Sequence, residues 1–326
     1  MTAPAGTLIR SATVGEREDL EDTIYRVAQE DRPITNAIGK VKVKSVLHDW
    51  QTDTLAARDP DNAALEGDDI STYDTNTQPT RVGVLCQIFE NNGSISGTAD
   101  ALNLAGRETE LQRQKTKKGI ELLNDMESRL AANKASIAES GATTRKTAGL
   151  LAWIATNDSL GATGSSGGWS SGGIVAAATN GTQRTLTESL LKGVLVTGYT
   201  SGARYKQVFF SGTHKQQASG FTGIADIRVS AGNSGQATIV AGADRYQSDF
   251  GPLDFMPHPD LTRDVLGIDP EGFAIGTLRG VQTKMLAPQG DNIKWQTLAE
   301  KCFIAKNEKK GFVIRDLTEE PTGSLP

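Results

Sequence analysis

The sequence predicts an α+β protein of two domains, with extensions that need a further surface to pack against. Its 326 residues are more than twice the usual length of a domain, which is about 150 residues. Strand-like alternation occurs toward both ends of the chain, and one long helical pattern lies between them. Glycine is abundant, with 35 residues, and aromatic residues make up only 6%, so the core is modest for a chain of this length.

Charge and composition exclude several classes of protein. The chain has 34 Lys and Arg residues and 39 Asp and Glu residues. Its net charge of −5 excludes a protein whose surface is generally basic and binds nucleic acid. No segment has the roughly 20 apolar residues of a membrane span, and Met1–Arg10 is too polar for a signal peptide. Cys86 and Cys302 are too few for a disulfide framework or a structural zinc site. We therefore expect a soluble, intracellular protein whose two cysteines are small buried residues.

The N-terminal segment predicts a polar arm followed by a helix. Residues 1–15 are small and polar, and helical spacing begins at about residue 16. Pro33 is expected to end this helix. Three apolar residues share one helical face: Leu20, Ile24 and Val27. The segment is either an ordinary packed helix or an arm that docks on a neighbouring subunit, and the sequence leaves both open.

The clearest strand pattern follows the arm. Apolar residues alternate with polar ones from Val41 to Trp50, with a change of phase near Ser45 that predicts a β-bulge. A returning strand places four apolar side chains on one face: Val82, Val84, Cys86 and Ile88. Residues 53–79, which connect the two strands, are mostly polar and contain one basic and seven acidic residues. The pattern predicts a long acidic hairpin over about residues 41–88.

The length of this connection points to a role outside a compact domain. Connections this long are usually functional or disordered. The segment has apolar contacts to offer through Leu55, Leu65, Ile70 and Tyr73. Because a lone hairpin is marginally stable in water, we interpret it as resting on another surface, with a disordered insert as the alternative. The cluster of Glu66, Asp68 and Asp69 lacks the ligand spacing of a calcium loop, which favours a solvated tip over a cation site.

The strongest helical signal covers residues 107–138, which contain no proline and a single glycine. About 32 residues at 1.5 Å each give a rod of roughly 48 Å. Its apolar residues recur at helical spacing: Ile120, Leu123, Met126 and Leu130. Seven basic and six acidic residues share the remaining faces, and mixed charge is typical of a solvated surface. The acidic ones are Glu108, Glu110, Glu121, Asp125, Glu127 and, one residue past the end of the range, Glu139. A coiled coil is the rival interpretation, weakened by fewer than four clean heptads.

The second half of the chain predicts a further domain of short elements. The Gly/Ser-rich run 161–173 indicates a flexible loop, and it lacks the Lys-Ser or Lys-Thr pair of a phosphate-binding loop. A helix capped by Thr185 and a strand at Gln207–Phe210 are expected next. Further strands are expected around Tyr246, Phe255, Phe273–Ile275, Cys302–Ala305 and Phe312–Ile314. The turn Asn307–Gly311 predicts that the last two strands form a hairpin.

A search for catalytic chemistry finds no recognisable site. The three histidines, His48, His214 and His258, fall in three different segments and lie outside HExxH and CxxC contexts. A hydrolytic triad or a metal site needs histidines to converge with carboxylates. We therefore expect three ordinary polar residues, no cofactor, no metal and no enzymatic activity. A long chain without a catalytic constellation is typical of a structural protein.

Several runs of residues resemble a known family of structural proteins. They are Arg17–Tyr25, Pro33-Ile34, Ile38–Lys40, Lys44-Ser45, His48–Ala56, Phe209–Gly212, Val265–Pro270 and Lys306–Gly311. Together they resemble the major capsid proteins of tailed bacteriophages, in the subgroup known as the SU10-type major head proteins. The His-Asp-Trp-Gln-Thr-Asp stretch at 48–53 is the most specific of these runs. The resemblance extends over nearly the whole chain.

The resemblance implies the HK97-like capsid fold, an α+β fold with four parts. It implies an N-terminal arm at 1–35 and an extended hairpin loop at 36–90. A peripheral domain would comprise 91–148 and 286–326, with its spine helix at about 107–138, and an axial domain would comprise 149–285. The chain lacks the long, charged, helical pro-domain of some relatives, so a fused scaffold is not expected. No Lys–Asn pair is identified for covalent cross-linking.

The implied function is that of a self-assembling subunit. Hexamers and pentamers would form the icosahedral head of a virion around double-stranded DNA, without sequence-specific contacts, after assembly in the cytoplasm of the host bacterium. Separate scaffold, decoration and portal proteins are possible partners, and no membrane is expected. Candidate interface residues are Asp19, Tyr25, Lys42, Lys44, His48, Trp50, Asp53, Arg58, Glu66, Asp68, Asp69, Lys115, Lys117 and Lys118. In this scheme the acidic hairpin of one subunit meets the three α-helical lysines of another.

Three alternatives predict different observations. An encapsulin-like shell would contain protein cargo in place of DNA. A hydrolase or metal-dependent enzyme would bring the histidines together with carboxylates in one pocket. A surface-adhesion module would bind its ligand as a discrete monomer.

Overall fold

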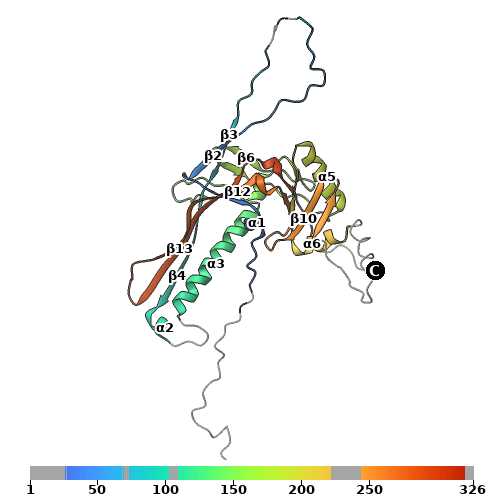
Figure 1. Cartoon of the computed structure of the whole chain (residues 1–326). Coiled ribbons are helices and arrows are strands. Elements are labelled where there is room, and N and C mark those ends of the chain that lie inside the picture. Colours follow the sequence, from blue (N-terminus) through green and yellow to red (C-terminus); the bar gives the residue numbers. More distant parts are fainter. Residues whose placement is uncertain are drawn as a thin grey trace, which may run out of the picture.

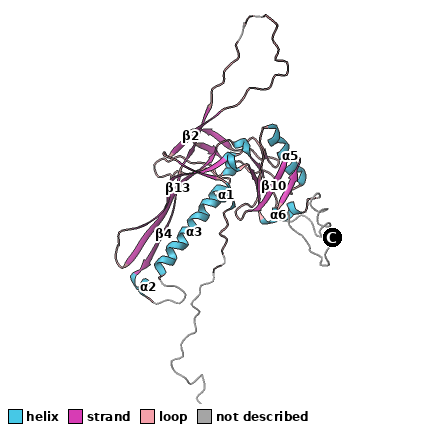
Figure 2. Ribbon diagram, viewed as in Figure 1, coloured by secondary structure: helices cyan, strands magenta, loops and turns pink. Residues whose placement is uncertain are grey.

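The chain is built around two β-sheets and one long helix, as Figures 1 and 2 show. The computed structural model describes residues 26, 28–67, 69, 73–102, 109–221 and 244–319. The four-stranded sheet has the order β1 (Gly39–Lys42), β12 (Phe273–Met285), β13 (Asn292–Ala305), β4 (Gln87–Ser96). The six-stranded sheet has the order β5 (Asp158–Ser159), β14 (Gly311–Ile314), β11 (Val265–Ile268), β8 (Gln207–Phe210), β10 (Gly251–Pro257), β9 (Arg245–Ser248).

The long helix α3 (Glu110–Ala131) lies along the four-stranded sheet, as Figure 1 shows. Its buried face carries Leu122, Met126 and Leu130 at spacings of four residues. The helix has 22 residues, about 33 Å at 1.5 Å each, so the predicted 32-residue rod is too long. Ala132 after the helix is extended, and the Arg129 guanidinium donates to the carbonyls of Thr147 and Ala135 in the chain that follows.

The N-terminal elements differ from the prediction in two ways. Pro33 begins α1 (Pro33–Ala37), where a residue without an N–H group costs no hydrogen bond, and residues 28–32 are not helical. The rest of the predicted arm helix lies outside the described residues. The change of phase near Ser45 is a break between strands, and no β-bulge is formed there. β1 runs parallel to β12, and the chain then leaves that sheet for β2 (Leu47–Thr52), which pairs with β3 (Thr80–Leu85).

The Gly/Ser-rich run is an ordered hairpin, which corrects the prediction of a flexible loop. β6 (Gly168–Ser171) pairs with β7 (Ile174–Ala176). Gly172 and Gly173 turn between them at φ of 53° and 81°, a conformation that glycine adopts without strain. The Asp316 carboxylate accepts hydrogen bonds from the backbone N–H groups of Gly161 and Gly181, so buried polar contacts fix the segment.

Two expectations for the second half are wrong in detail. Helix α5 (Glu188–Thr200) is capped by the hydroxyl of Thr187, which accepts from Leu190 N, and Thr185 lies before the cap. The strands β13 and β14 do not pair with each other. The short 3₁₀ helix η4 (Glu308–Lys310) carries the chain from the four-stranded to the six-stranded sheet, where β14 pairs with β11 and β5. The expected strands β8, β9 and β10 are confirmed.

The six-stranded sheet has a packed core on each face. Phe209 points to the core that also contains the spine helix and α4 (Leu150–Trp153), whereas Val208 and Phe210 point to the core under α5. This alternation follows from the two-residue period of a strand. Two short helices, α2 (Gly97–Ala101) and α6 (Gly212–Ser219), follow β4 and β8, and the 3₁₀ helix η3 (Pro270–Gly272) precedes β12. Among the described helices, none combines the length and apolar character that a membrane crossing requires.

Candidate assembly surfaces

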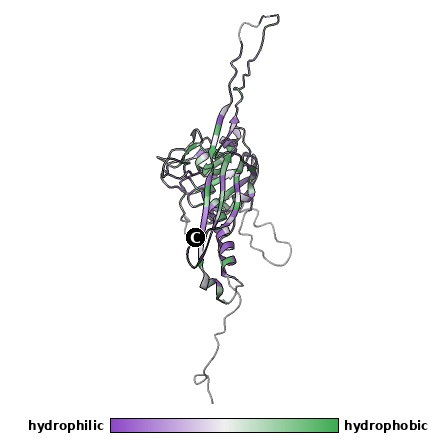
Figure 3. Cartoon of the chain, turned by 90° about the vertical axis from the view of Figure 1, so that its left-hand side faces the viewer, coloured by the Kyte–Doolittle hydropathy of each residue, from purple (hydrophilic) through white to green (hydrophobic). Residues whose placement is uncertain are grey.

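The most prominent feature of the surface is the predicted hairpin. Its root is confirmed as an antiparallel pair that runs from Leu47 opposite Leu85 to Thr52 opposite Thr80. Beyond that pair, the described residues 53–67, 69 and 73–79 form neither helix nor strand. The segment projects from one end of the molecule in Figure 1 and stays clear of the body when the view is turned by 90° in Figure 3.

Large apolar side chains lie on this projection and are almost fully accessible. The exposed fractions are 98% for Leu55, 78% for Leu65 and 87% for Tyr73. A segment that holds such side chains away from its own core gains nothing from them in the isolated chain. They are available for contact with another molecule.

The root of the hairpin is anchored to its own subunit. The indole N–H of Trp50 donates to the Lys306 carbonyl at 3.1 Å, and its ring centre lies 5.8 Å from that of Trp153. The His48 ring is 6.0 Å from Trp50 on the same strand. Arg81 Nε donates to the Asp49 carboxylate at 3.0 Å across the two strands. The hairpin therefore leaves the body in a defined direction.

The predicted interface residues fall into three groups. On and before the hairpin, the exposed ones are Lys42, Lys44, Asp53, Arg58, Glu66 and Asp69, while His48 and Trp50 are half-buried. The helix α3 carries Lys115, Lys117 and Lys118. Asp19, Tyr25 and Asp68 lie outside the described residues. The role of all fourteen in contacts between subunits stays a prediction.

One chain does not bring the acidic hairpin and the α3 lysines together. The hairpin and the first half of α3 lie toward opposite ends of the molecule in Figure 1. Within the helix, the Lys118 and Lys117 ammonium groups lie 2.7 Å and 3.8 Å from carboxylate oxygens of Glu121. Contact between hairpin and lysines therefore requires two chains.

A buried carboxylate joins the arm, the spine helix and the six-stranded sheet. Glu127 of α3 is 0% exposed and accepts from the backbone N–H groups of Ile34 at 2.8 Å and Thr35 at 3.0 Å. It also accepts from the Thr35 hydroxyl and lies 3.0 Å from Nε2 of His258, which follows β10. The mixed charge of this helix predicts a solvated Glu127, and that prediction is wrong. The sequence does contain a signal that Glu127 is buried, because it lies on the same helical face as Leu123, Met126 and Leu130. A carboxylate on an apolar face needs hydrogen-bond partners in the interior.

These contacts set the protonation of Glu127. Burial raises its pKa, but the hydrogen bonds from His258, Thr35 and Ile34 outweigh burial and bring the pKa below its ordinary value of 4.5. A carboxyl group with a depressed folded-state pKa adds stability that is fully present above its unfolded pKa. This stability is lost as the pH falls through the folded-state pKa.

The pH dependence of Glu127→Gln tests this assignment. At neutral pH we expect the variant to have a lower free energy of unfolding than the native chain. The difference is expected to shrink as the pH falls from 4.5 through the lowered pKa, because Glu127 then becomes protonated in both states. Urea titrations of both chains across this range measure the difference. A difference that is constant with pH would contradict the assignment.

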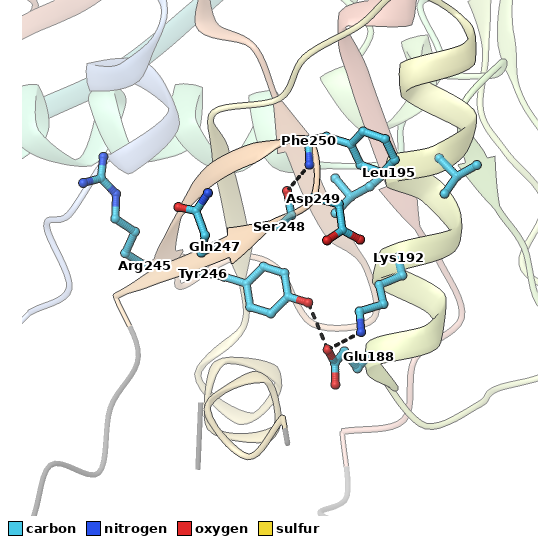
Figure 4. A pocket seen from close by; sticks show the side chains of 10 residues that line it. Glu188, Lys192, Leu195, Arg245, Tyr246, Gln247, Ser248, Asp249 and Phe250 are labelled. Carbon is cyan, nitrogen blue, oxygen red and sulfur yellow. Dashed lines mark hydrogen bonds and ion pairs between the residues drawn. The ribbon is translucent and has the colours of Figure 1, made fainter. Parts of the chain in front are cut away.

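A cavity of about 630 Å³ lies between α5 and the hairpin of β9 and β10, as Figure 4 shows. At its floor the Glu188 carboxylate accepts from the Tyr246 hydroxyl at 2.9 Å and lies 2.8 Å from the Lys192 ammonium. Burial, together with this hydrogen bond, raises the pKa of Tyr246 to about 12. Glu188, Lys192 and Tyr246 thus pair with one another, and the rest of the lining mixes polar residues such as Gln247 and Asp249 with the half-exposed Val196.

The three histidines have three different sets of partners. His214 is 0% exposed, and its Nδ1 and Nε2 lie 2.8 Å from the Ser211 hydroxyl and 3.0 Å from the Thr318 carbonyl. Burial lowers the pKa of His214. His258 is 2% exposed and contacts Glu127, whereas His48 lies beside Trp50. In the part of the chain that the structure describes, no three His, Cys, Asp or Glu residues are grouped as metal ligands. The convergence in one pocket that a hydrolase requires is therefore not found among the described residues.

Comparison with known proteins identifies the family. Residues 6–318 match the SU10 major capsid protein family. Over 122 residues the chain is 31% identical to the major capsid protein of Escherichia phage Phieco32, a match that covers 37% of this chain and 34% of that protein. The chain thus spans about a third of the length of this relative.

Solved structures agree on the fold. The capsid asymmetric unit of Cyanophage A-1(L) matches with a TM-score of 0.67 at 13% identity, over 94% of this chain and 98% of that one. The holo-SrpI encapsulin complex of Synechococcus elongatus matches with a TM-score of 0.55 at 8% identity, over 93% and 95%. Phage capsids and an encapsulin share the fold, so the fold alone does not separate them, whereas the family match does. The chain belongs to the SU10 major capsid protein family, and its fold is the HK97-like fold of phage capsid proteins.

Proposed function

We propose that this chain is the repeated subunit of an icosahedral phage head, in which hexamers and pentamers enclose double-stranded DNA. The observation that carries the proposal is the hairpin, whose apolar residues Leu55, Leu65 and Tyr73 have no core of their own. Membership of the capsid protein family supports the same function. In a closed shell each hairpin has a neighbouring subunit beside it. The apolar side chains that are exposed in the isolated chain can then be buried against that neighbour, in every subunit of the shell.

We propose the two-domain division implied by the resemblance, adjusted to the observed sheets. The four-stranded sheet with α3 serves as the peripheral domain, and the six-stranded sheet with α5 and α6 serves as the axial domain. β12 lies within 149–285 but pairs in the four-stranded sheet, and β14 lies within 286–326 but pairs in the six-stranded sheet. The chain thus crosses between domains just before Phe273 and again at η4.

Electrostatics favours contact between the hairpin and α3 of different subunits. The described hairpin residues include exposed Asp53, Glu66 and Asp69, and the first half of α3 carries Lys115, Lys117 and Lys118. Opposite charges of this kind contribute to the register of an interface and to its rate of formation. We infer that the three lysines form the basic surface on which a neighbouring hairpin lies.

The remaining partners follow from the same proposal. A net charge of −5 suits a wall that contains DNA without binding it tightly or by sequence. Scaffold, decoration and portal proteins are separate partners in this scheme, the subunit has no enzymatic activity, and shells form in the host cytoplasm. An encapsulin-like shell is the second candidate, and the SrpI fold match supports it at the level of fold alone.

The size and content of the purified assembly test the proposal. We expect light scattering and negative-stain imaging to show closed shells of megadalton mass, and particles from infected cells to contain nuclease-protected DNA. Protein cargo in place of DNA would favour the encapsulin-like alternative. A 34.6 kDa monomer at every salt concentration, even after co-expression with neighbouring phage proteins, would contradict the proposal.

A further inference from the structure

We propose that Cys86 and Cys302, the two cysteines of the chain, form a disulfide under oxidising conditions and thereby join the root of the hairpin to the four-stranded sheet. They lie 216 positions apart in the sequence. The fold brings them to the same point, where β3 ends and β4 begins beside the central strand β13.

The strand register places the two residues opposite each other. β4 and β13 are antiparallel, and their last pair is Gln87 with Lys301. Continued by one residue, to the position just before β4, this register brings Cys86 opposite Cys302. Directly opposed residues of antiparallel strands have Cα atoms about 4.5–5.5 Å apart, within the span of about 4.4–6.8 Å that a disulfide bridges. Their side chains point to the same face of the sheet.

Burial and hydrogen bonding agree with the register. Both side chains are 0% exposed and belong to one hydrophobic core. Cys86 Sγ lies 3.6 Å from the Ser45 carbonyl, so its thiol is held at the root of the hairpin. Accepting a hydrogen bond from Cys302 lowers the pKa of Cys86, and the same contact together with burial raises the pKa of Cys302. Cys86 is thus the thiol that reaches the reactive thiolate form first.

The position of Cys86 gives the bond a mechanical role. Its backbone N–H donates to the Val46 carbonyl at 2.8 Å, and its own carbonyl accepts from Arg145 Nε at 2.9 Å. These contacts hold the point at which the hairpin departs from the sheet. A disulfide to Cys302 adds a covalent bond to these hydrogen bonds. The root of the hairpin then cannot separate from β13 when the hydrogen bonds break.

The reaction is an ordinary thiol–disulfide exchange with a small disulfide such as oxidised glutathione. The Cys86 thiolate attacks one glutathione sulfur and releases glutathione thiolate. Cys302, after losing its proton to solvent, attacks the Cys86 sulfur of the mixed disulfide and releases the second glutathione. Two protein thiols are oxidised to one disulfide, and one glutathione disulfide is reduced to two thiols. Because both cysteines are buried, the rate follows the opening of the hairpin root.

Mass spectrometry of the unmodified full chain tests the proposal. The purified protein is incubated with oxidised glutathione, quenched with N-ethylmaleimide in denaturant and digested with trypsin without reductant. We expect peptide 82–107 to be linked to peptide 302–306, as the cleavage sites at Arg81, Arg107, Lys301 and Lys306 define them. Dithiothreitol added before the quench is expected to release both peptides, and the unreduced protein to run as a monomer.

Two results would overturn the proposal. One is alkylation of both cysteines by N-ethylmaleimide after prolonged oxidation of the folded chain. For this result to count, a second sample of the same preparation, unfolded in urea, must be fully oxidised by the same treatment. The other is a linkage between chains, which appears as a dimer without reductant. As a matched control, Cys302→Ser leaves Cys86 in place and is expected to give only its mixed disulfide with glutathione. Because the main measurement uses the native sequence, it stands even if that variant fails to fold.

Discussion

A chain that lacks residues 56–76 is expected to fold normally and to form no shells. The deletion joins Leu55 to Thr77 and leaves a connection of six residues between the paired Thr52 and Thr80, a normal length for a hairpin loop. It removes Leu65 and Tyr73, which contribute nothing to either core. Subunit stability is therefore retained, whereas the surface proposed to lie on a neighbour is lost.

Light scattering measures assembly, and circular dichroism measures the fold. The matched control replaces residues 56–76 with a Gly/Ser segment of equal length, which keeps the reach of the hairpin but removes its apolar and acidic side chains. If neither the deletion nor the Gly/Ser variant assembles, the contact between subunits depends on the side chains of residues 56–76 and not on the length of the hairpin. Shells of normal size from the deleted chain would show that the hairpin does not hold subunits together.

Replacement of Glu127 by Ala is expected to destabilise the subunit more than removal of any surface charge. It leaves the N–H groups of Ile34 and Thr35 and the His258 ring without their shared acceptor in the interior. Breaking a buried pair by removing one partner costs about 3–5 kcal/mol. We expect a loss of that size in the free energy of unfolding, measured with urea on the chain without residues 56–76 so that subunit contacts do not contribute.

Glu121→Ala is the matched control on the same helix. Its carboxylate is 37% exposed and contacts only the lysines one turn away, for which a loss of about 0–1 kcal/mol is expected. Both variants replace a glutamate of the same helix by alanine. The difference between their losses in the free energy of unfolding therefore measures the effect of the burial of Glu127 and of its hydrogen-bond partners. If Glu127→Ala lowered the free energy of unfolding no more than Glu121→Ala does, the contacts of Glu127 with the arm and the six-stranded sheet would not stabilise the subunit.

The sequence predicted those parts of the fold that local patterns specify. The two-residue alternation of β2 and β3, the charged connection between them and the periodicity of α3 were all visible in the chain. The family resemblance added the arrangement of these parts, which periodicity cannot supply. The fold class and the family were confirmed on that basis.

The errors arose where contacts distant in sequence decide the structure. The periodicity of α3 gives no signal for its end at Ala131. The contacts at that end include the carbonyl of Thr147, 18 positions after Arg129. The hairpin expected around Asn307 fails for a similar reason, because β13 and β14 each find partners in a different sheet. The order in the Gly-rich hairpin depends on Asp316, about 150 positions later.

The order of the strands also limits when the subunit can fold. β1 and β4 are made early, yet both belong to a sheet whose other two strands, β12 and β13, come near the end of the chain. About 210 residues separate Ser96 from Ala305, which takes roughly 10–40 s at the usual rates of synthesis. During that time two unpaired strand edges and the exposed apolar side chains of the hairpin emerge from the ribosome with nothing to cover them. We therefore expect chaperones that cover these edges during synthesis to raise the yield of folded subunit in a heterologous host.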